Sequence, residues 1–199
     1  MKYLLLLTAF LAVIASSSAQ ENPDCGWYGT KTVAERNAMF PFNKAKKVVL
    51  VSYPDRMDTL ARAGDKRPLT ERMQILDTIN FKRGEFRECT YYIIERAELN
   101  QGWINFFSHL LVNYTVKQEP QDGYGAALCY QPRNSILFYD ENGSIICCYE
   151  ICFECGHGGI WPDPDKLYNS YVVNNCAEPY KQLKFIFSEN GITYGIDEK

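Results

Sequence analysis

Residues 135–151, which read SILFYDENGSIICCYEI, constrain the fold of this chain more than any other stretch. They form two apolar runs separated by Asp-Glu-Asn-Gly, and both runs contain residues that favour β-strands. Asn142-Gly143 is the strongest short hairpin signal, because a type I′ turn needs a positive φ at both of its central residues. The stretch therefore predicts an antiparallel hairpin with a type I′ turn.

The second run of this hairpin determines which way its cysteines point. Every second residue of a strand is expected on the same face of the sheet. One face is expected to carry Ile145, Cys147, Tyr149 and Ile151, and the other Ile146, Cys148, Glu150 and Cys152. The face of Cys147 is the more apolar one, so we interpret Cys147 as core packing, where a thiol behaves as a small apolar group.

Elsewhere, apolar residues recur at strand or helix spacing. Strands are predicted at 46–54 and 89–99, and helices at 67–80 and 100–114. In the second helix we expect His109 and Asn113 to face water, because they lie off its apolar stripe. That stripe consists of Trp103, Phe106, Phe107, Leu110, Leu111 and Tyr114.

The last part of the chain, residues 179–196, fits two structures. Its apolar spacing agrees with a helix that Gly191 ends, followed by a short strand. A second hairpin fits as well, but Pro179 suits a first helical turn and favours the helix. Together the patterns predict a single α+β domain over residues 20–199, with a mainly antiparallel sheet, packed helices and an internal joint at 118–125.

The first 19 residues have the pattern of a signal peptide, with Lys2, an apolar run and the small residues Ser17-x-Ala19. The mature chain, residues 20–199, is therefore expected to be secreted or periplasmic. No stretch reaches the roughly 20 apolar residues of a membrane helix, so no membrane span is expected. Basic residues are dispersed and the formal net charge is −3, so nucleic acid is not an expected partner.

The chain has eight cysteines, all within the predicted mature part. In an exported chain an even number indicates disulfides before metal binding. The favoured arrangement bonds Cys152 and Cys155 to Cys129 and Cys176, which would tie the hairpin to the C-terminal segment. The full set of disulfide candidates is Cys25, Cys89, Cys129, Cys152, Cys155 and Cys176.

Two alternatives remain for the C-x-x-C motif at 152–155. It is similar to one knuckle of a zinc site, with Cys152, Cys155, His157 and Cys176 as the proposed ligands and zinc as the alternative cofactor. It also fits a redox dithiol. The glycines and prolines in the following GHGGIWPDP disfavour the helix that a thioredoxin fold has directly after the motif. A redox role would therefore need a different fold.

Residues 36–53 and 129–155 resemble a family of uncharacterised proteins exported by bacteria. The shared features are a CY-x-PRN element, the hairpin and an EICF-x-C motif. The resemblance covers about half of the mature chain. It implies export and a single fold, and it implies no catalytic residue.

These observations favour an exported, non-catalytic binding or structural module, with no cofactor and with a protein or small-molecule partner. The alternative is a zinc-binding or dithiol redox protein that uses Cys152 and Cys155. Asn113 and Asn142 match the N-glycosylation pattern, and both are expected at the surface.

Overall fold

The computed structural model describes residues 24–54, 93–117, 131–162 and 169–197. Their largest element is a five-stranded sheet whose neighbouring strands are all antiparallel. In spatial order its strands are β3 (Glu95–Glu98), β2 (Lys47–Ser52), β5 (Asn134–Tyr139), β6 (Ile145–Cys152) and β7 (His157–Trp161). The strand predicted at 46–54 is confirmed as β2, and β3 lies within the described part, 93–99, of the strand predicted at 89–99.

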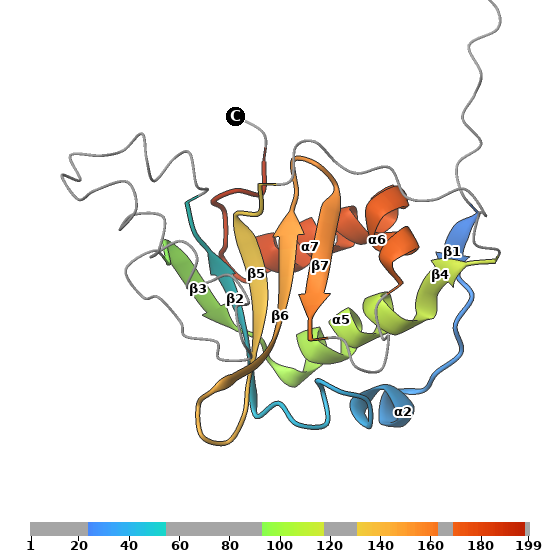
Figure 1. Ribbon diagram of the computed structural model, residues 1–199, viewed down its shortest axis with the longest axis horizontal. Coiled ribbons are helices and arrows are strands. Elements are labelled where there is room, and N and C mark those ends of the chain that lie inside the picture. Colours follow the sequence, from blue (N-terminus) through green and yellow to red (C-terminus); the bar gives the residue numbers. More distant parts are fainter. Residues whose placement is uncertain (1–23, 55–92, 118–130, 163–168, 198–199) are drawn as a thin grey trace, which may run out of the picture.

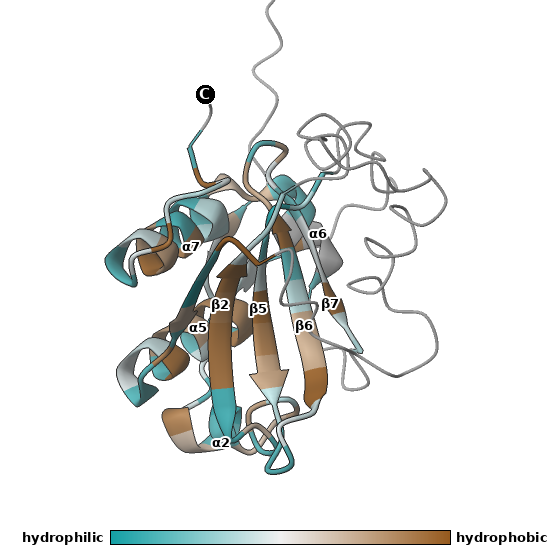
Figure 2. Cartoon of the chain, turned by 90° about the vertical axis from the view of Figure 1, so that its left-hand side faces the viewer, coloured by the Kyte–Doolittle hydropathy of each residue, from teal (hydrophilic) through white to brown (hydrophobic). Residues whose placement is uncertain are grey.

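Helices α5 (Gln101–Asn113) and α7 (Ala177–Glu189) lie on one face of this sheet (Figures 1 and 2). A short helix, α6 (Ser170–Asn175), leads into α7. The helix predicted at 100–114 and the class of helices on a mainly antiparallel sheet are thus confirmed. Within the described ranges, no helix is long and apolar enough to cross a bilayer. The predicted signal peptide, the helix at 67–80 and the joint at 118–125 lie outside those ranges.

Large aromatic side chains form the main core between the sheet and the helices. Phe107 of α5 lies 6.2 Å from Phe138 of β5 and 5.9 Å from Tyr149 of β6, between ring centroids. All three side chains are at most 1% exposed. Strand β2 precedes residues 118–125 and β5 follows them, and the two strands pair, so the described residues on both sides share one sheet.

The predicted hairpin is present as β5 and β6, but its turn is not of type I′. The Asp140 N–H donates to the Ser144 carbonyl at 2.9 Å, and the Gly143 N–H donates to the Asp140 carbonyl at 3.2 Å. The loop therefore has three residues and ends at Gly143, whose φ is +77°. Three-residue loops that end in a left-handed glycine are another common hairpin connection.

A β-bulge next to this turn reverses the expected faces of two side chains. The register pairs Tyr139 with Ile145 and Phe138 with Cys147, and it skips Ile146. Ile145 therefore packs on the face away from the helices and Ile146 against the main core, so their predicted faces are wrong. Beyond the bulge the prediction holds, with Cys147, Tyr149 and Ile151 in the main core and Cys148 on the opposite face.

An N-terminal segment, residues 24–45, packs along α5, and we call it the strap. It contains β1 (Cys25–Trp27) and the short helix α2 (Val33–Asn37). Strand β1 pairs antiparallel with β4 (Tyr114–Val116), which directly follows α5. The predicted presence of a disulfide is confirmed by a bond between Cys25 of the strap and Cys176, the residue before α7.

The C-terminal segment is helical, as favoured, but it lacks the predicted strand. Helix α7 ends at Glu189, and Gly191 follows with a φ of +79°. Residues 192–197 then form turns instead of a strand. They stay close to the sheet, since Ile192 and Ile196 are only 1% and 3% exposed.

Glu95 of β3 holds this C-terminal turn against the sheet. One of its carboxylate oxygens, Oε2, accepts from the Ser52 hydroxyl and from the Thr193 and Tyr194 N–H groups, each at 2.9 Å. The Thr193 hydroxyl donates to Oε1 at 2.7 Å. Partial burial acts to raise the pKa of Glu95, but the hydrogen bonds outweigh it and hold the pKa below its usual value.

Replacing Glu95 by glutamine is expected to destabilise the protein by roughly 1 kcal/mol near neutral pH, since a neutral amide oxygen is a weaker acceptor than a carboxylate. The folded-state pKa lies below the value of about 4.3 in unfolded chains. The advantage of the wild type is therefore complete above that pH and is lost as the pH falls through the folded-state pKa. Urea unfolding at a series of pH values measures this difference.

Glu98→Gln is the matched control, because Glu98 is an exposed residue of the same strand. Its stability near neutral pH should stay within about 0.5 kcal/mol of the wild type. A Glu95→Gln deficit that persists unchanged in acid would contradict the assigned role of the carboxylate.

Candidate functional site

The C-x-x-C motif lies in the turn between β6 and β7. Cys152 is the last residue of β6, and its cross-strand partner is His157, the first residue of β7. The four residues between them form the turn, which Gly156 completes with a φ of +62°. The motif is therefore part of an antiparallel hairpin and does not open a helix.

Phe153 anchors this turn on α7. Its ring lies 5.4 Å from Phe187 and 6.5 Å from Tyr180, between centroids, and both contacts are edge-on. The next residue, Glu154, is exposed and lies 4.0 Å from Arg133 in a loose ion pair. The turn thus has a fixed position against the helical layer, although one side of it reaches solvent.

The groups of the motif differ in their access to solvent. Cys152 is 1% exposed, whereas Cys155 and His157 are half-buried. The Nδ1 atom of His157 lies 3.0 Å from the Cys155 carbonyl oxygen. A carbonyl oxygen only accepts, so Nδ1 carries the hydrogen and the neutral ring keeps the lone pair on Nε2.

The disulfide differs from the predicted pairing. Cys176 is bonded to Cys25, with 6.2 Å between their Cα atoms, so the predicted bond from Cys176 to Cys152 or Cys155 is wrong. A pairing across 151 residues of sequence leaves no local signal, which is why the sequence could not reveal it. The remaining disulfide candidates, Cys89 and Cys129, lie outside the described residues.

The same bond changes the set of proposed zinc ligands. Zinc binds thiolates, and Cys176 offers none while it is bonded to Cys25. Of the proposed ligands, the structure brings Cys152, Cys155 and His157 to one turn. In the part of the chain that the structure describes, no group of three or more His, Cys, Asp or Glu side chains is arranged to hold a metal ion.

Buried polar groups lie on the sheet face opposite the helices. The hydroxyls of Tyr53 and Ser135 are 2.8 Å apart, and Ser135 is the cross-strand partner of Glu150. Cys148 shares this face and is 2% exposed. Burial, together with the charge of Glu150, raises the pKa of the Cys148 thiol well above its usual value, so this thiol stays protonated and unreactive.

The expected exposure is wrong for Asn113, which is buried, and only partly right for His109, which is half-buried, because the strap covers that side of α5. The Asn113 side chain is 2% exposed, accepts from the Lys31 N–H at 3.1 Å and donates to the Lys31 carbonyl at 2.9 Å. The His109 ring stacks on Trp27 with 4.6 Å between centroids. The expected surface position of Asn113 as a glycan acceptor is therefore also wrong, whereas Asn142 is exposed as predicted.

Arg36 of α2 fastens the strap to α5 through a buried cation. It is 5% exposed, and its guanidinium donates to the Ser108 hydroxyl at 3.1 Å. It also donates to the carbonyls of Lys31 at 2.6 Å and Asn105 at 3.4 Å. Burial lowers the pKa of Arg36, but a guanidinium stays charged in proteins, so this group is a polar tether.

Three aromatic side chains meet where α5 contacts α7, and we call Trp103, Phe106 and Phe185 the ring patch. Trp103 lies 5.8 Å from Phe185 and 6.1 Å from Phe106, between ring centroids, and both contacts are edge-on. Phe185 is 50% exposed, and the other two rings are half-buried. Helical periodicity assigned Trp103 and Phe106 to the core and gave no signal for Phe185.

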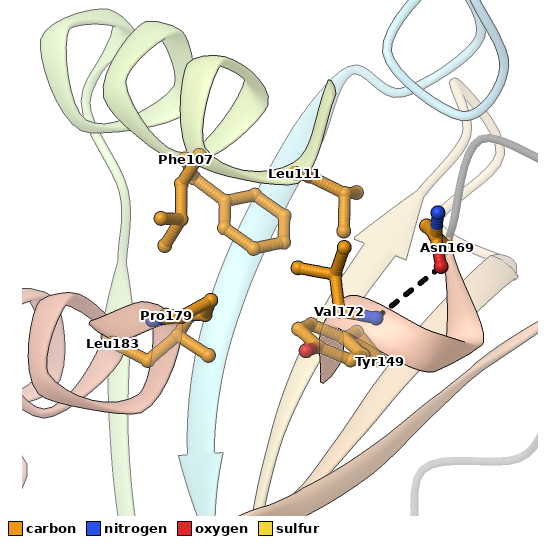
Figure 3. A pocket seen from close by; sticks show the side chains of 8 residues that line it. Phe107, Leu111, Tyr149, Asn169, Val172, Pro179 and Leu183 are labelled. Carbon is orange, nitrogen blue, oxygen red and sulfur yellow. Dashed lines mark hydrogen bonds between the residues drawn. The ribbon is translucent and has the colours of Figure 1, made fainter. Parts of the chain in front are cut away.

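A small hollow lies between the sheet and the helices (Figure 3). It is lined by Phe107 of α5, Tyr149 of β6 and Leu183 of α7, among others. One polar group of its lining, the Asn169 side-chain oxygen, already accepts from the Val172 N–H at 3.2 Å. The space admits only about one water molecule, so we interpret it as incomplete core packing and not as a ligand site.

Comparisons with protein-family models, curated proteins and solved structures gave no match to this chain. The expected relation to exported bacterial proteins therefore stays a prediction.

Proposed function

We propose that this protein is an exported, non-catalytic binding module that holds a partner protein on the ring patch. The observation that carries the proposal is the exposure of Phe185, half of whose surface reaches solvent while its ring contacts Trp103. Single exposed apolar residues are common on soluble proteins. Clustered aromatic rings are not, and they mark interaction surfaces.

The composition of the patch fits contact with another protein. Trp and other aromatic residues are enriched at protein interfaces, and Trp is prominent among the residues that contribute most to affinity. Lys181 lies one turn before Phe185 on α7 and pairs with Glu178 at 3.6 Å. These charged groups provide the polar rim that surrounds the apolar centre of such interfaces.

Rigid support is a second argument for this surface. Helix α5 is held against the sheet by Phe107 in the main core, and the strap holds it through the hydrogen bond from Arg36 to Ser108. The disulfide to Cys176 anchors the start of α7. A patch whose supports are already ordered loses little entropy on binding, which favours affinity.

Export is part of the proposal and is supported by the sequence of residues 1–19 and by the Cys25–Cys176 disulfide. Disulfides persist mainly in oxidising compartments outside the cytoplasm. We extend the proposal to a single domain over residues 20–199, because the described strands on both sides of 118–125 belong to one sheet.

The variant Phe185→Ser is expected to weaken binding of the partner about tenfold or more, since loss of a central aromatic anchor costs about 2 kcal/mol. The partner is first recovered from the extracellular fraction of the source cells, and its affinity is measured by calorimetry. Trp161→Ser is the matched control, because it removes a comparably exposed ring on β7 outside the patch, and it should change the affinity less than about threefold. Equal affinities of Phe185→Ser and the wild type would contradict the proposal.

A further inference from the structure

The contact between the strap and the end of α5 depends on one amide side chain. Asn113, the last residue of α5, is 2% exposed. Its side-chain oxygen accepts from the Lys31 N–H at 3.1 Å, and its side-chain nitrogen donates to the Lys31 carbonyl at 2.9 Å. The two segments lie so close that a Cβ on Gly29 would be 2.6 Å from the Asn113 Cα atom. The strap is thus fastened to α5 at Lys31 by the orientation of this amide.

The two bonds to Lys31 also fix the protonation state of a neighbouring imidazole. They determine which side-chain atom of Asn113 is the oxygen and which is the nitrogen. The second hydrogen of that nitrogen is left for the His109 Nδ1 atom, which lies 2.8 Å away. An amide nitrogen only donates, so Nδ1 must accept and carries no hydrogen. His109 is therefore neutral, with its hydrogen on Nε2, while the strap is bound.

Protonation of His109 is incompatible with this arrangement. An imidazolium carries a hydrogen on both ring nitrogens and accepts none. If the ring stays in place, two donors face each other, and if Asn113 turns its oxygen toward His109, both bonds to Lys31 are lost. If the ring turns away instead, the buried Asn113 amide loses an acceptor. Each response costs the closed contact at least one hydrogen bond.

The groups around His109 favour its neutral form. Partial burial lowers the pKa of His109, and the charge of Arg36 on the strap, where Lys31 is a further cation, lowers it more. Stacking on Trp27 favours the cation but does not reverse this shift. Tyr114 of β4 stays neutral, because burial raises its pKa. Three carboxylates on the elements packed around α5 have other partners: Asp24 of β1 binds Tyr28 and Lys117, Glu35 of α2 binds Thr32, and Glu178 of α7 binds Lys181 and Gln182.

We propose that His109 and Asn113 form a pH-sensitive latch that releases the strap at Lys31 when His109 is protonated. In the released state His109 has the ordinary pKa of about 6.5, whereas in the closed contact its pKa is lower. The latch is therefore at full strength above about pH 6.5, and it weakens as the pH falls from there toward the pKa of the closed contact. The disulfide at Cys25 and the hydrogen bonds of Arg36 still hold the strap, so the release is confined to the residues between them.

Amide hydrogen exchange of the Lys31 N–H measures the latch, because this group donates to Asn113. Rates are expressed as protection factors, which removes the pH dependence of the exchange chemistry itself. The protection factor of Lys31 should fall about fivefold between about pH 7.5 and about pH 5, the factor that corresponds to one net hydrogen bond. Gly29→Ala forces the strap away from Asn113 and should lower this protection already at the higher pH.

The chain contains two histidines, which provide a matched pair of variants. His109→Asn keeps an acceptor beside Asn113 but cannot be protonated, so the fall at Lys31 should vanish. His157→Asn, at the start of β7, should leave it intact. If His109→Asn does not fold, nitrogen NMR of the wild type reports the same state, with the His109 hydrogen on Nε2 at neutral pH and a pKa below about 6.5.

Three results would overturn the proposal. The first is a Lys31 protection factor in the wild type that does not fall with pH. The second is a fall that persists in folded His109→Asn or disappears in His157→Asn. The third is a His109 ring that carries its hydrogen on Nδ1 at neutral pH, because that ring could not accept from Asn113.

Discussion

Replacing Cys25 and Cys176 together by alanine is expected to lower the free energy of unfolding by about 2 to 5 kcal/mol. The bond closes a loop of 151 residues in sequence, so its loss frees most of the unfolded chain from a constraint. It also detaches one end of the strap from α7. The midpoint of urea unfolding under non-reducing conditions measures the change.

Wild-type protein that is unfolded in the presence of a reductant is the control, and its midpoint should match that of the double variant. Amide hydrogen exchange should increase first in the strap, because the disulfide anchors the strap and not the central strands. A loss of less than about 1 kcal/mol would mean that Arg36 and Asn113 hold the strap without covalent help.

The variant Phe107→Ala is expected to lower the free energy of unfolding by about 3 to 5 kcal/mol, the second large effect. Phe107 is 1% exposed, and its ring lies among the rings of Phe42, Phe138 and Tyr149. Its truncation leaves a cavity next to the hollow that already exists beneath α5. Thermal and urea unfolding, compared with the wild type, measure the loss.

Phe185→Ala is the matched control, because it removes the same ring atoms from a half-exposed position of the neighbouring helix. It should lower the free energy of unfolding by less than about 1 kcal/mol, since a half-exposed ring has few packing contacts to lose. This pair of variants separates stability from binding, because Phe107→Ala destabilises the support of the ring patch and Phe185→Ala only alters its surface. Similar stability losses in both variants would contradict the assignment of Phe185 to the surface.

Local patterns predicted the elements that local forces determine. The hairpin at 135–151 was predictable because a turn signal lies between two β-favouring runs. Helix α5 was predictable because its apolar residues recur at helical spacing. Even there, the type of turn and the bulge at Ile146 escaped prediction, since the same residues fit several loop lengths.

Elements that depend on tertiary contacts were missed. The strap binds α5 through polar groups, and periodicity treats polar residues such as Asn113 as solvent-facing. Strand β7 was also missed, because its glycines have low β propensity. Gly158 is nevertheless required, since a Cβ at this position would lie 2.8 Å from the Glu150 carbonyl oxygen. Close backbone packing of this kind leaves a glycine in the sequence but does not identify its partner.

The candidate site was only partly predictable for the same reason. The spacing of Cys152, Cys155 and His157 was visible in the sequence, and the structure brings them to one turn. The ring patch was invisible, because Trp103 and Phe185 are 82 positions apart and meet only when α5 packs on α7. Residues that are far apart in the sequence form a common surface only after the chain has folded.

Site-specific photo-crosslinking tests the central claim, partner binding on the ring patch, most directly. A photoreactive phenylalanine analogue replaces Phe185 in one protein and Trp161, an equally accessible ring on β7, in another. Both proteins are expressed in the source cells and irradiated there. The proposal predicts a covalent complex with one defined protein from position 185 and none from position 161. An absence of adduct at 185, or equal adducts at both positions, would contradict it.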